Sequence, residues 1–406
     1  MISFQQAQRL IEKNTPGPKR QTIRVADSLG YVIAEDVKTP FPLPQYDHSA
    51  MDGYVLRSRD INSASKKNPI FLKIAGALKA GDPPKFLPPK KAYRIMTGAL
   101  IPRGGNAVLL KEEATVEGKD LVITKRVAPG AHIRLRGEEL KKGAQVVFNG
   151  TVIHPAVAAI LASLGKGKVQ VFARPRVSVI ATGSELIQAG TKLTRGKIYD
   201  SNSVMISSAL RLLGVEPFLV KTVQDRPGIL RKIVRKALRS SDLVILIGGI
   251  SVGDYDYVKD ILRGLGVRQI FWKVNQKPGK PIYFGKRRNV IVFGLPGNPA
   301  SVFTCFYEYV YLAIRSMSGF VNPGLRTEKQ KLSKAVASDR QKLVFLKAKV
   351  QPSQNGRAVT PLPHQGSHMI SSLCDTNALV LIPPNGRGVK KGEKVVTHVL
   401  PFLAGG

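Results

Sequence analysis

Cysteine and long apolar runs are scarce in this sequence of 406 residues. The two cysteines, Cys305 and Cys374, are too few to predict a disulfide framework or a cysteine-based metal site, and a reducing cytoplasm fits them best. No apolar run approaches the roughly 20 residues needed to cross a bilayer. Residues 1–15 place their apolar side chains on one helical face and have no basic start, which predicts an amphipathic helix rather than a signal peptide. We therefore expect a soluble cytoplasmic protein that does not enter a membrane.

Acidic residues are also scarce. The chain has 27 Asp and Glu but 63 Lys and Arg, which gives a formal net charge of +36. A field of this sign attracts anions and would support non-specific binding of nucleic acid. The basic residues are nevertheless spread along the chain in short groups, such as Lys66-Lys67 and residues 286–288, without a basic tail. This distribution favours a solvated basic surface on an enzyme with anionic ligands over a specific nucleic-acid binder, which stays an alternative.

Length and composition predict several domains, because 406 residues exceed the size of an ordinary single core. Residues 39–144 are rich in proline and glycine and contain short alternating apolar runs, which is typical of a β-rich insertion. A helix is expected at residues 155–164, and it should return the chain to pack on the N-terminal region that precedes the insertion. We expect a discontinuous N-terminal domain, a β-rich insertion domain, an α/β domain and a small C-terminal β domain, at residues 1–43 with 145–172, 44–144, 173–321 and 322–406 respectively.

Strands and helices alternate between residues 174 and 319. Short apolar segments such as residues 177–181 and 243–247 are expected to be strands that are covered on both faces. Helices are expected at residues 203–213, 228–238 and 302–315. This alternation predicts a doubly wound, mainly parallel sheet, so the fold class is α/β plus β, in several domains. Ligands of such sheets bind in the loops beyond the carboxyl ends of the strands.

Four loops at the predicted strand ends have a composition suited to phosphate and metal binding: residues 182–186, 248–256, 277–280 and 294–299. Glycine lets backbone N–H groups approach phosphate oxygens, lysine supplies positive charge, and proline stiffens a loop. The candidate substrate-binding residues are Gly248, Gly249, Ser251, Gly253, Lys273, Lys277, Lys280, Pro296, Gly297 and Pro299. Glu185, Asp254 and Asp256 add carboxylates, which suit a Mg²⁺ ion among phosphates.

Each of these loops also has a purely structural interpretation. Asp256 could cap a helix and Pro299 could simply start one, while Lys273 and Lys277 could lie on a solvated face. The occurrence of four such loops, on strands that could meet at one sheet edge, favours a binding site.

Three further loops, residues 47–54, 94–99 and 136–140, mix polar, small and bulky residues without a period. Such loops carry sites more often than core segments do, although ordinary turn chemistry is the alternative. His48 has no histidine or cysteine partner at ligand spacing, so it does not predict a metal site. Nucleophilic catalysis is not predicted either, because Ser49 and Ser251 lack a nearby His–Asp pair.

The ordered set of motifs resembles that of molybdopterin molybdenumtransferases, also called molybdenum insertases, a family that includes the E domain of gephyrin. The matching segments are residues 47–54, 94–99, 182–186, 198–202, 248–257, 277–281, 294–299, 377–383 and 391–393. They cover almost the whole chain in order. The resemblance implies an elongated, four-domain homodimer whose active site lies between the α/β domain of one subunit and the β-rich insertion of the other.

The resemblance also implies a reaction, the Mg²⁺-dependent transfer of molybdate onto adenylylated molybdopterin with release of AMP. Position by position, the residues that match catalytic ones are Asp52, Thr97, Glu185, Asp225 and Asp256. Glu185 and Asp256 would hold Mg²⁺ or position water, and Asp52 and Thr97 would reach across the dimer interface. Lysines and glycine-loop amides would hold phosphate and molybdate. The family context also admits contact with other proteins of the molybdenum-cofactor pathway.

The sequence departs from the family's pattern at three positions, with Ser184 in place of Asp or Asn, Glu139 in place of Asp, and His48 in place of Asn. The first two keep oxygen chemistry, and His48 could make the interface sensitive to pH. Three other functions stay open: adenylylation of molybdopterin by ATP, a scaffold role like that of gephyrin, and nucleic-acid binding. The two β-rich domains favour insertion over adenylylation, which needs the α/β domain alone.

Overall fold

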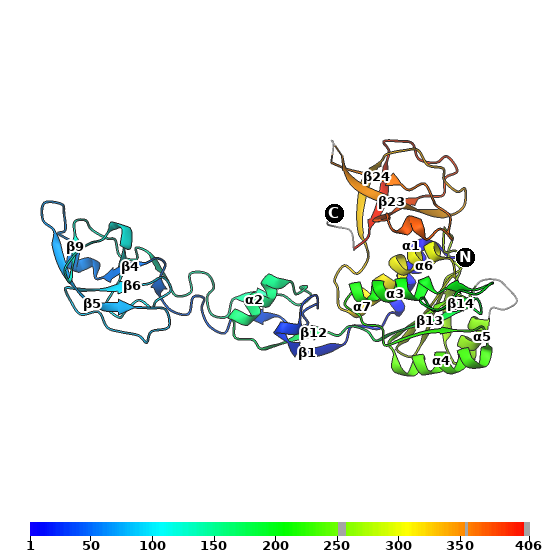
Figure 1. Ribbon diagram of the computed structural model, residues 1–406, viewed down its shortest axis with the longest axis horizontal. Coiled ribbons are helices and arrows are strands. Elements are labelled where there is room, and N and C mark those ends of the chain that lie inside the picture. Colours follow the sequence, from blue (N-terminus) through cyan, green and yellow to red (C-terminus); the bar gives the residue numbers. More distant parts are fainter. Residues whose placement is uncertain (251–256, 354–355, 402–406) are drawn as a thin grey trace. The chain divides into compact units, whose positions relative to one another are not determined.

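The computed structural model describes residues 1–250, 257–353 and 356–401 (Figure 1). The chain divides into two compact units, and each is described by itself. Unit 1 comprises Met1–Glu35, Gly150–Ala158 and Gly167–Gly406, and unit 2 comprises Asp36–Asn149 and Ala159–Lys166. In the part of the chain that the structure describes, no helix combines the length and the apolar character that a membrane crossing requires.

Unit 1 contains a six-stranded sheet with the strand order β16-β13-β17-β21-β20-β18. The strands are β13 (Val177–Thr182), β16 (Leu219–Val223), β17 (Leu243–Ile247), β18 (Arg268–Trp272), β20 (Tyr283–Arg287) and β21 (Val290–Leu295). The strands β16, β13, β17 and β21 pair in parallel, whereas β20 pairs antiparallel with both β21 and β18. The sheet is therefore mainly parallel, as predicted, with one reversed strand. The reversal arises because only two residues join Arg287 to Val290, which are paired, and so short a connection makes a hairpin.

Helices cover both faces of this sheet (Figure 1). They are α1 (Phe4–Asn14), α3 (Ser201–Leu212), α4 (Pro227–Ser240), α5 (Tyr257–Gly264), α6 (Pro299–Cys305) and α7 (Tyr311–Met317). A short π-helical segment at Phe306–Val310, which we call the π-turn, joins the last two. Strand side chains alternate between the faces, so Val177 and Val179 join the core under α1, α3, α6 and α7, while Ile180 joins the core under α4 and α5. The doubly wound arrangement follows from this alternation.

The N-terminal helix α1 belongs to this core. Ser3 caps it in a reciprocal capping box with Gln6, and Phe4, Ala7 and Ile11 are buried in the cluster that includes α7 and the π-turn. The helix packs its apolar face on the α/β layer, because that face has the spacing of a buried stripe.

The C-terminal part of unit 1 forms a closed β-structure. Its strands are β19 (Gln276–Lys277), β22 (Arg326–Leu332), β23 (Leu343–Ser353), β24 (Gly356–Pro361), β25 (Ala378–Ile382) and β26 (Lys394–Val399). They follow the order β19-β23-β24-β22-β26-β25, and an additional β23–β25 pairing closes five of them into a ring. β19, which precedes this region in the chain by many residues, extends the ring at β23. We call this region the barrel.

Unit 2 contains the predicted β-rich insertion. Its main sheet has the order β7-β4-β6-β5-β9-β8, with β4 (Gly53–Leu56), β5 (Ile70–Leu78), β6 (Lys91–Ile95), β7 (Ala107–Leu110), β8 (Thr115–Glu117) and β9 (Asp120–Ile123). Two short pairs accompany it, β3 (His48–Ser49) with β10 (Ile133–Arg134) and β2 (Val37–Lys38) with β11 (Gln145–Val147). β1 (Arg20–Arg24) pairs with β12 (Lys168–Phe172) within unit 1, and α2 (Pro155–Ser163) has residues in both units. The exact domain boundaries stay a prediction.

Candidate anion-binding site

The predicted phosphate loops meet at one edge of the α/β sheet. β13, β17 and β21 are parallel, so the residues that follow them, from Gly183, Gly248 and Pro296 onward, leave the sheet at its carboxyl edge. β20 runs the other way and its first residue, Tyr283, pairs with Gly294 near the end of β21. The segment before β20, which contains Lys277 and Lys280, therefore reaches the same edge.

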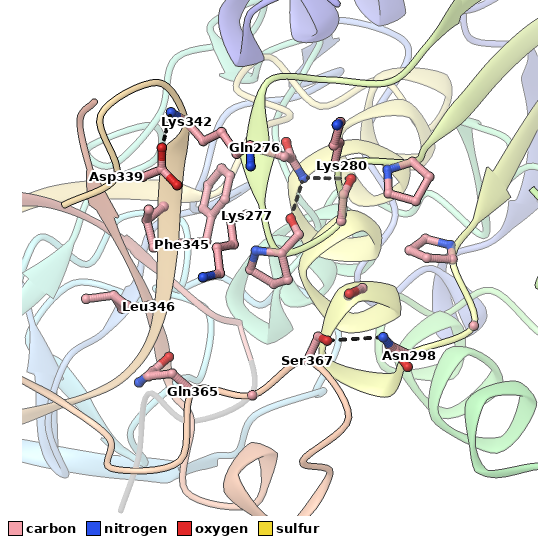
Figure 2. Close-up of a pocket in the computed structure, with 18 of the residues that line it drawn as sticks. Gln276, Lys277, Lys280, Asn298, Asp339, Lys342, Phe345, Leu346, Gln365 and Ser367 are labelled. Atoms are coloured by element: carbon pink, nitrogen blue, oxygen red, sulfur yellow. Dashed lines mark hydrogen bonds between the residues drawn. The ribbon is translucent and has the colours of Figure 1, made fainter. Parts of the chain in front are cut away.

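A cavity of about 870 Å³ lies between this edge and the barrel (Figure 2). Five of the predicted residues line it, namely Gly249, Lys277, Lys280, Pro296 and Gly297. The barrel side contributes polar residues that the sequence did not single out, namely Ser338, Asp339, Lys342, Gln365 and Ser367. Three lysines against one carboxylate make this lining basic, and the cavity is therefore suited to an anion.

The lysine loop, residues 276–281, packs against α6 and pairs with a strand of the barrel. Gln276 and Lys277 form β19 and pair with Leu343 and Val344 of β23. Gly279 has a φ of 81°, and a Cβ atom there would lie 2.5 Å from the sulfur of Cys305 on α6. Glycine is thus required both by the backbone conformation and by this close approach.

The loop of residues 365–367 joins the barrel to α6. Asn298 Nδ2 donates to Ser367 Oγ at 3.1 Å, and the N–H of Ala300 donates to the carbonyl of Ser367 at 3.0 Å. Asn202 of α3 donates to the carbonyl of Gly297 at 2.7 Å. Both sides of the cavity wall are therefore fixed by hydrogen bonds. Pro299 begins α6 and does not line the cavity.

Lys347 on β23 is a buried amine directly behind this wall. Its Nζ donates to the carbonyl of Gly366 at 3.2 Å and to Ser372 Oγ at 2.6 Å, and neither acceptor carries a charge. Burial lowers the pKa of Lys347 from its ordinary value. Gln365 exchanges hydrogen bonds with the backbone of the same lysine, so this loop is fastened to Lys347 at two points.

Asp339 is the carboxylate of the described cavity wall. It accepts hydrogen bonds from the backbone N–H groups of Gln341 at 2.8 Å and Lys342 at 3.0 Å. These two bonds, followed by the charges of Lys342 and Lys277, hold the pKa of Asp339 below its usual range. Asp339 therefore stays ionised, and it orders the turn that carries Lys342.

Asp225 and Glu185 lie at the same sheet edge but do not line the cavity. Asp225 accepts hydrogen bonds from Thr182 Oγ1 and, at 3.2 Å, from the N–H of Ser184. Glu185 is exposed, and its carboxylate folds back toward Gly183. Gly248 has a φ of 88°, and a Cβ there would lie 2.5 Å from the carbonyl oxygen of Thr182, so this glycine keeps two strand ends together.

Lys273 lies against the indole ring of Trp272 rather than in the cavity. Its Nζ is 3.8 Å from the ring centroid, and Lys259 lies over the same ring at 3.4 Å. Trp272 Nε1 donates to the carbonyl of Ile250 at 3.1 Å. The tryptophan thus connects Lys273 to the end of the loop at residues 248–250. The sequence did not reveal this cation–π contact.

Unit 2 brings Asp52 and Thr97 together. Asp52 Oδ1 accepts hydrogen bonds from the backbone N–H and from Oγ1 of Thr97, both at 2.7 Å. These bonds, the backbone one first, lower the pKa of Asp52. His48 contacts the carbonyl of Tyr46 at 3.1 Å through Nδ1, and Glu139 is exposed. The structure thus pairs the two predicted catalytic residues of the insertion.

Four predicted residues, Ser251, Gly253, Asp254 and Asp256, lie outside the described residues. Within the described residues no group of three or more His, Cys, Asp or Glu side chains is arranged to hold a metal ion. Glu185 is therefore the one predicted Mg²⁺ ligand whose surroundings are described.

Comparison with known proteins defines the class of this chain. Residues 2–165 match the family described as MoeA N-terminal region (domain I and II), residues 178–316 match a probable molybdopterin binding domain, and residues 329–400 match the MoeA C-terminal region (domain IV). The class is thus that of multidomain molybdenum-cofactor enzymes with an α/β molybdopterin-binding domain.

Relatives match over nearly the full length. A molybdopterin molybdenumtransferase of Staphylococcus aureus is 34% identical over 390 residues, 96% of this chain and 93% of the relative. One from Staphylococcus epidermidis is 33% identical over 395 residues, covering 97% and 94% respectively. A solved structure of the molybdopterin biosynthesis MoeA protein from Pyrococcus horikoshii has a TM-score of 0.85 at 29% identity and covers 98% of this chain and 99% of its own. The chain belongs to the molybdopterin molybdenumtransferase family and is a transferase.

Proposed function

We propose that this enzyme inserts molybdate into adenylylated molybdopterin in a Mg²⁺-dependent reaction that releases AMP. The observation that carries the proposal is the basic cavity, which lies at the carboxyl edge of the domain that matches molybdopterin binding. Molybdate, the pterin phosphate and AMP are all anions, and a cavity with an excess of lysines raises their local concentration. The free thiols of Cys305 and Cys374 agree with a reaction in the cytoplasm.

We assign the binding of anionic groups to the three lysines of the cavity, Lys277, Lys280 and Lys342. Gly297 leaves its surroundings open, with no atom within 4 Å of a Cβ built there, so a substrate oxygen could approach its backbone. Pro296 is buried at the end of β21 and stiffens the same loop.

We assign Mg²⁺ binding to Glu185 and Asp256. Mg²⁺ usually keeps several waters and takes one or two protein carboxylates together with substrate phosphates, so a closed protein cage is not required. Glu185 is exposed at the sheet edge, which leaves its carboxylate accessible to such an ion. When bound, Mg²⁺ would neutralise phosphate charge. Asp225 is instead committed to Thr182 and Ser184, so its role is to hold the first loop against the end of β16.

We further propose that the enzyme is a homodimer in which the Asp52–Thr97 pair of one subunit completes the site of the other. This assignment rests on the family resemblance. Contacts with other proteins of the molybdenum-cofactor pathway belong to the same proposal.

The test is molybdate-dependent release of AMP. Purified enzyme is incubated with adenylylated molybdopterin and Mg²⁺, with and without molybdate, as wild type, Lys277→Met and Lys329→Met. Lys329 is an exposed lysine on β22 that does not line the cavity, so its variant controls for the loss of one positive charge. We expect release that requires molybdate and is lost in Lys277→Met alone.

Two outcomes would overturn the proposal. ATP-dependent adenylylation of free molybdopterin, without molybdate-dependent AMP release, would move the enzyme to the preceding step. Equal activity of Lys277→Met and Lys329→Met would remove the cavity from the reaction.

A further inference from the structure

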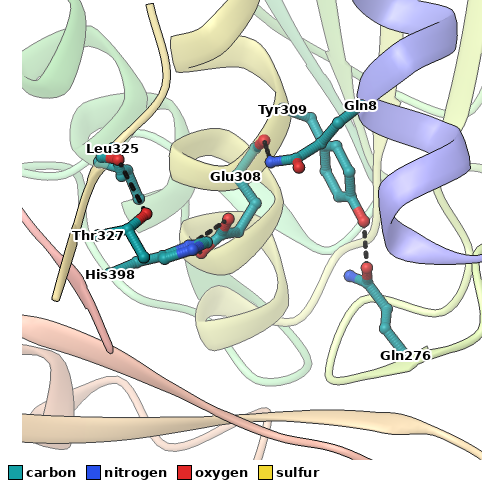
Figure 3. Close-up of polar contacts among 7 residues, drawn as sticks. All are labelled: Gln8, Gln276, Glu308, Tyr309, Leu325, Thr327 and His398. Carbon is teal, nitrogen blue, oxygen red and sulfur yellow. Dashed lines mark hydrogen bonds and ion pairs between the residues drawn. The ribbon is translucent and has the colours of Figure 1, made fainter. Parts of the chain in front are cut away.

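The helical segment that follows the glycine–proline loop is interrupted by a π-turn at Phe306–Val310. All five side chains of this turn are buried, and three of them, Tyr307, Glu308 and Tyr309, carry polar atoms. Figure 3 shows the partners of Glu308 and Tyr309. π-turns are rare within helices and often occur near functional sites. Tyr309 is the one of these residues whose hydroxyl is bonded to Gln276 of the lysine loop.

Tyr309 contacts Gln276, the first residue of the lysine loop. Its hydroxyl donates to Oε1 of Gln276, which is fully buried (Figure 3). The other end of that amide, Nε2, donates to the carbonyls of Pro278 at 3.0 Å and Gly279 at 3.3 Å. Because both carbonyls require a donor, the amide oxygen must face the tyrosine. Burial raises the pKa of Tyr309 well above its ordinary value, which keeps the hydroxyl a donor.

The two carbonyls that Gln276 holds lie between the two lysines of the loop. Pro278 and Gly279 separate Lys277 from Lys280, and both lysines line the cavity (Figure 2). At the far end of the loop, the N–H of Val274 donates to the carbonyl of Lys280 at 3.0 Å. The curvature of the loop, and with it the direction of both ammonium groups, therefore depends on the buried amide.

We propose that Tyr309 is a positioning residue for the anionic substrate: acting through Gln276, it fixes the loop that presents Lys277 and Lys280. Tyr309 itself does not line the cavity. The inference rests on the proposed function for the identity of the anion. It does not rest on it for the geometry of the loop, which can be measured without ligand.

The chain offers a matched control two residues away. Tyr311 is also buried, but its hydroxyl accepts a hydrogen bond from Arg315 at 2.9 Å and, among the described residues, is not hydrogen-bonded to the loop. Tyr309→Phe and Tyr311→Phe each remove one hydroxyl from a buried ring in the same helical segment. A general loss of packing or polarity would affect both variants, whereas loss of positioning would affect only the first.

The experiment measures the binding of inorganic molybdate by calorimetry and the kinetics of AMP release. We expect Tyr309→Phe to weaken molybdate binding and raise its KM about tenfold, the effect of one lost hydrogen bond of roughly 1.4 kcal/mol. The kcat at saturating molybdate should be retained, because the reacting groups are unchanged. Gln276→Met keeps the volume of the side chain. In that background Tyr309→Phe should cause no further loss of molybdate affinity, since the two residues act as one unit.

A second measurement keeps this inference separate from the proposed function. Without ligand, hydrogen exchange of the backbone amides of Lys277, Gly279 and Lys280 should accelerate in Tyr309→Phe and stay unchanged in Tyr311→Phe. Unchanged exchange in Tyr309→Phe, or an equal effect of both variants, overturns the positioning role. If the wild type neither binds molybdate nor releases AMP, the proposed function fails, while accelerated exchange in Tyr309→Phe alone would still support control of the loop. If Tyr309→Phe melts below Tyr311→Phe, Gln276→Met takes its place in both measurements.

Discussion

Gly279 occupies a position in the lysine loop that a larger residue cannot enter without a shift of the chain. Its φ of 81° disfavours alanine by about 1–2 kcal/mol, and the added Cβ would meet the Cys305 sulfur at 2.5 Å. We expect Gly279→Ala to destabilise the enzyme by at least that amount and to weaken molybdate binding by about tenfold or more. Calorimetric titration with molybdate and thermal unfolding check the two effects.

Gly297 provides the control for this substitution. It also lines the cavity, but nothing lies within 4 Å of a Cβ built there, and its φ is not in the left-handed region. Gly297→Ala should therefore leave stability nearly unchanged. Equal destabilisation by both substitutions would show that the fit of Gly279 against Cys305 is not the cause.

Asp52 gives a prediction about pH. Its pKa is lowered chiefly by the backbone N–H and hydroxyl of Thr97, so ionised Asp52 contributes stability above the ordinary value of 3.8, and this contribution is lost as the pH falls through the lowered pKa. Thr97→Val removes the hydroxyl alone and should move the Asp52 pKa upward, so the loss begins at a higher pH. Carboxyl carbon NMR titration measures this shift. Thr97→Ser, which keeps the hydroxyl, should titrate like the wild type, and identical titration of the valine variant would contradict the assignment.

Several residues of the cavity could be predicted because they lie in short loops beside predicted strands. Lys277, Lys280 and Gly249 lie in loops directly attached to strands whose buried character is plain in the sequence. Lys342 and Ser367 could not be found in this way, because each is an ordinary polar residue in a later domain, and Lys342 is one of 63 basic residues. Only the closure of the barrel beside the sheet edge brings them to the cavity.

At the scale of elements, strands and helices of the α/β layer were predicted to within a few residues, because short apolar strands and amphipathic helices have different periods. The reversed β20 was missed, although Arg288-Asn289 between two apolar runs is a hairpin signal: Arg288 has a φ of 53°. The π-turn was also missed, because we predicted one helix at residues 302–315, and no proline or glycine interrupts it there. Glu308 and Tyr309 of this turn have partners that are distant in the sequence, which a local pattern does not reveal.

The π-turn and the barrel are joined by a buried pair, and this contact is testable. Glu308 and His398 on β26 are both buried, with Nδ1 of the imidazole 2.9 Å from each carboxylate oxygen (Figure 3). His398→Leu should destabilise unit 1 by about 3 kcal/mol, because it leaves a buried carboxylate without its partner. Replacing both residues by leucine should recover most of that loss. Urea unfolding followed by the fluorescence of Trp272, the single tryptophan, reports on this unit.

This prediction separates a specific pair from simple packing. If the double variant is as unstable as His398→Leu, the volume of the side chains and not the unpaired carboxylate governs the loss. If His398→Leu is as stable as the wild type, the pair does not fasten the barrel to the helical layer.

At the scale of the whole molecule, the charged residues of the cavity explain only a small part of the net positive charge. The described cavity wall carries three lysines and one aspartate, whereas the chain has a net charge of +36. Exposed cations also gather on α4, at Arg231, Lys232, Arg235, Lys236 and Arg239. A basic surface steers anionic substrates toward the enzyme, but nothing in the structure explains an excess of this size.

The division of the site between subunits is the last prediction. If Asp52 of one subunit completes the cavity of the other, a heterodimer of Asp52→Asn and Lys277→Met chains contains one site with both changes and one site with neither. Co-expression of the two inactive variants should then restore about a quarter of wild-type AMP release, because half of the dimers are mixed and each has one intact site. Single-chain sites would restore nothing.

Lys277→Met co-expressed with Lys342→Met gives the matched control for this experiment. Both lysines line the same cavity of one chain, so every mixed dimer carries one change in each of its sites. This combination should stay inactive whether or not the subunits exchange. Activity in the first combination and none in the second would therefore place Asp52 and the lysine cavity in different subunits of one site, whereas inactivity of both, in dimers shown to be mixed by differential tagging, would place the whole site within one chain.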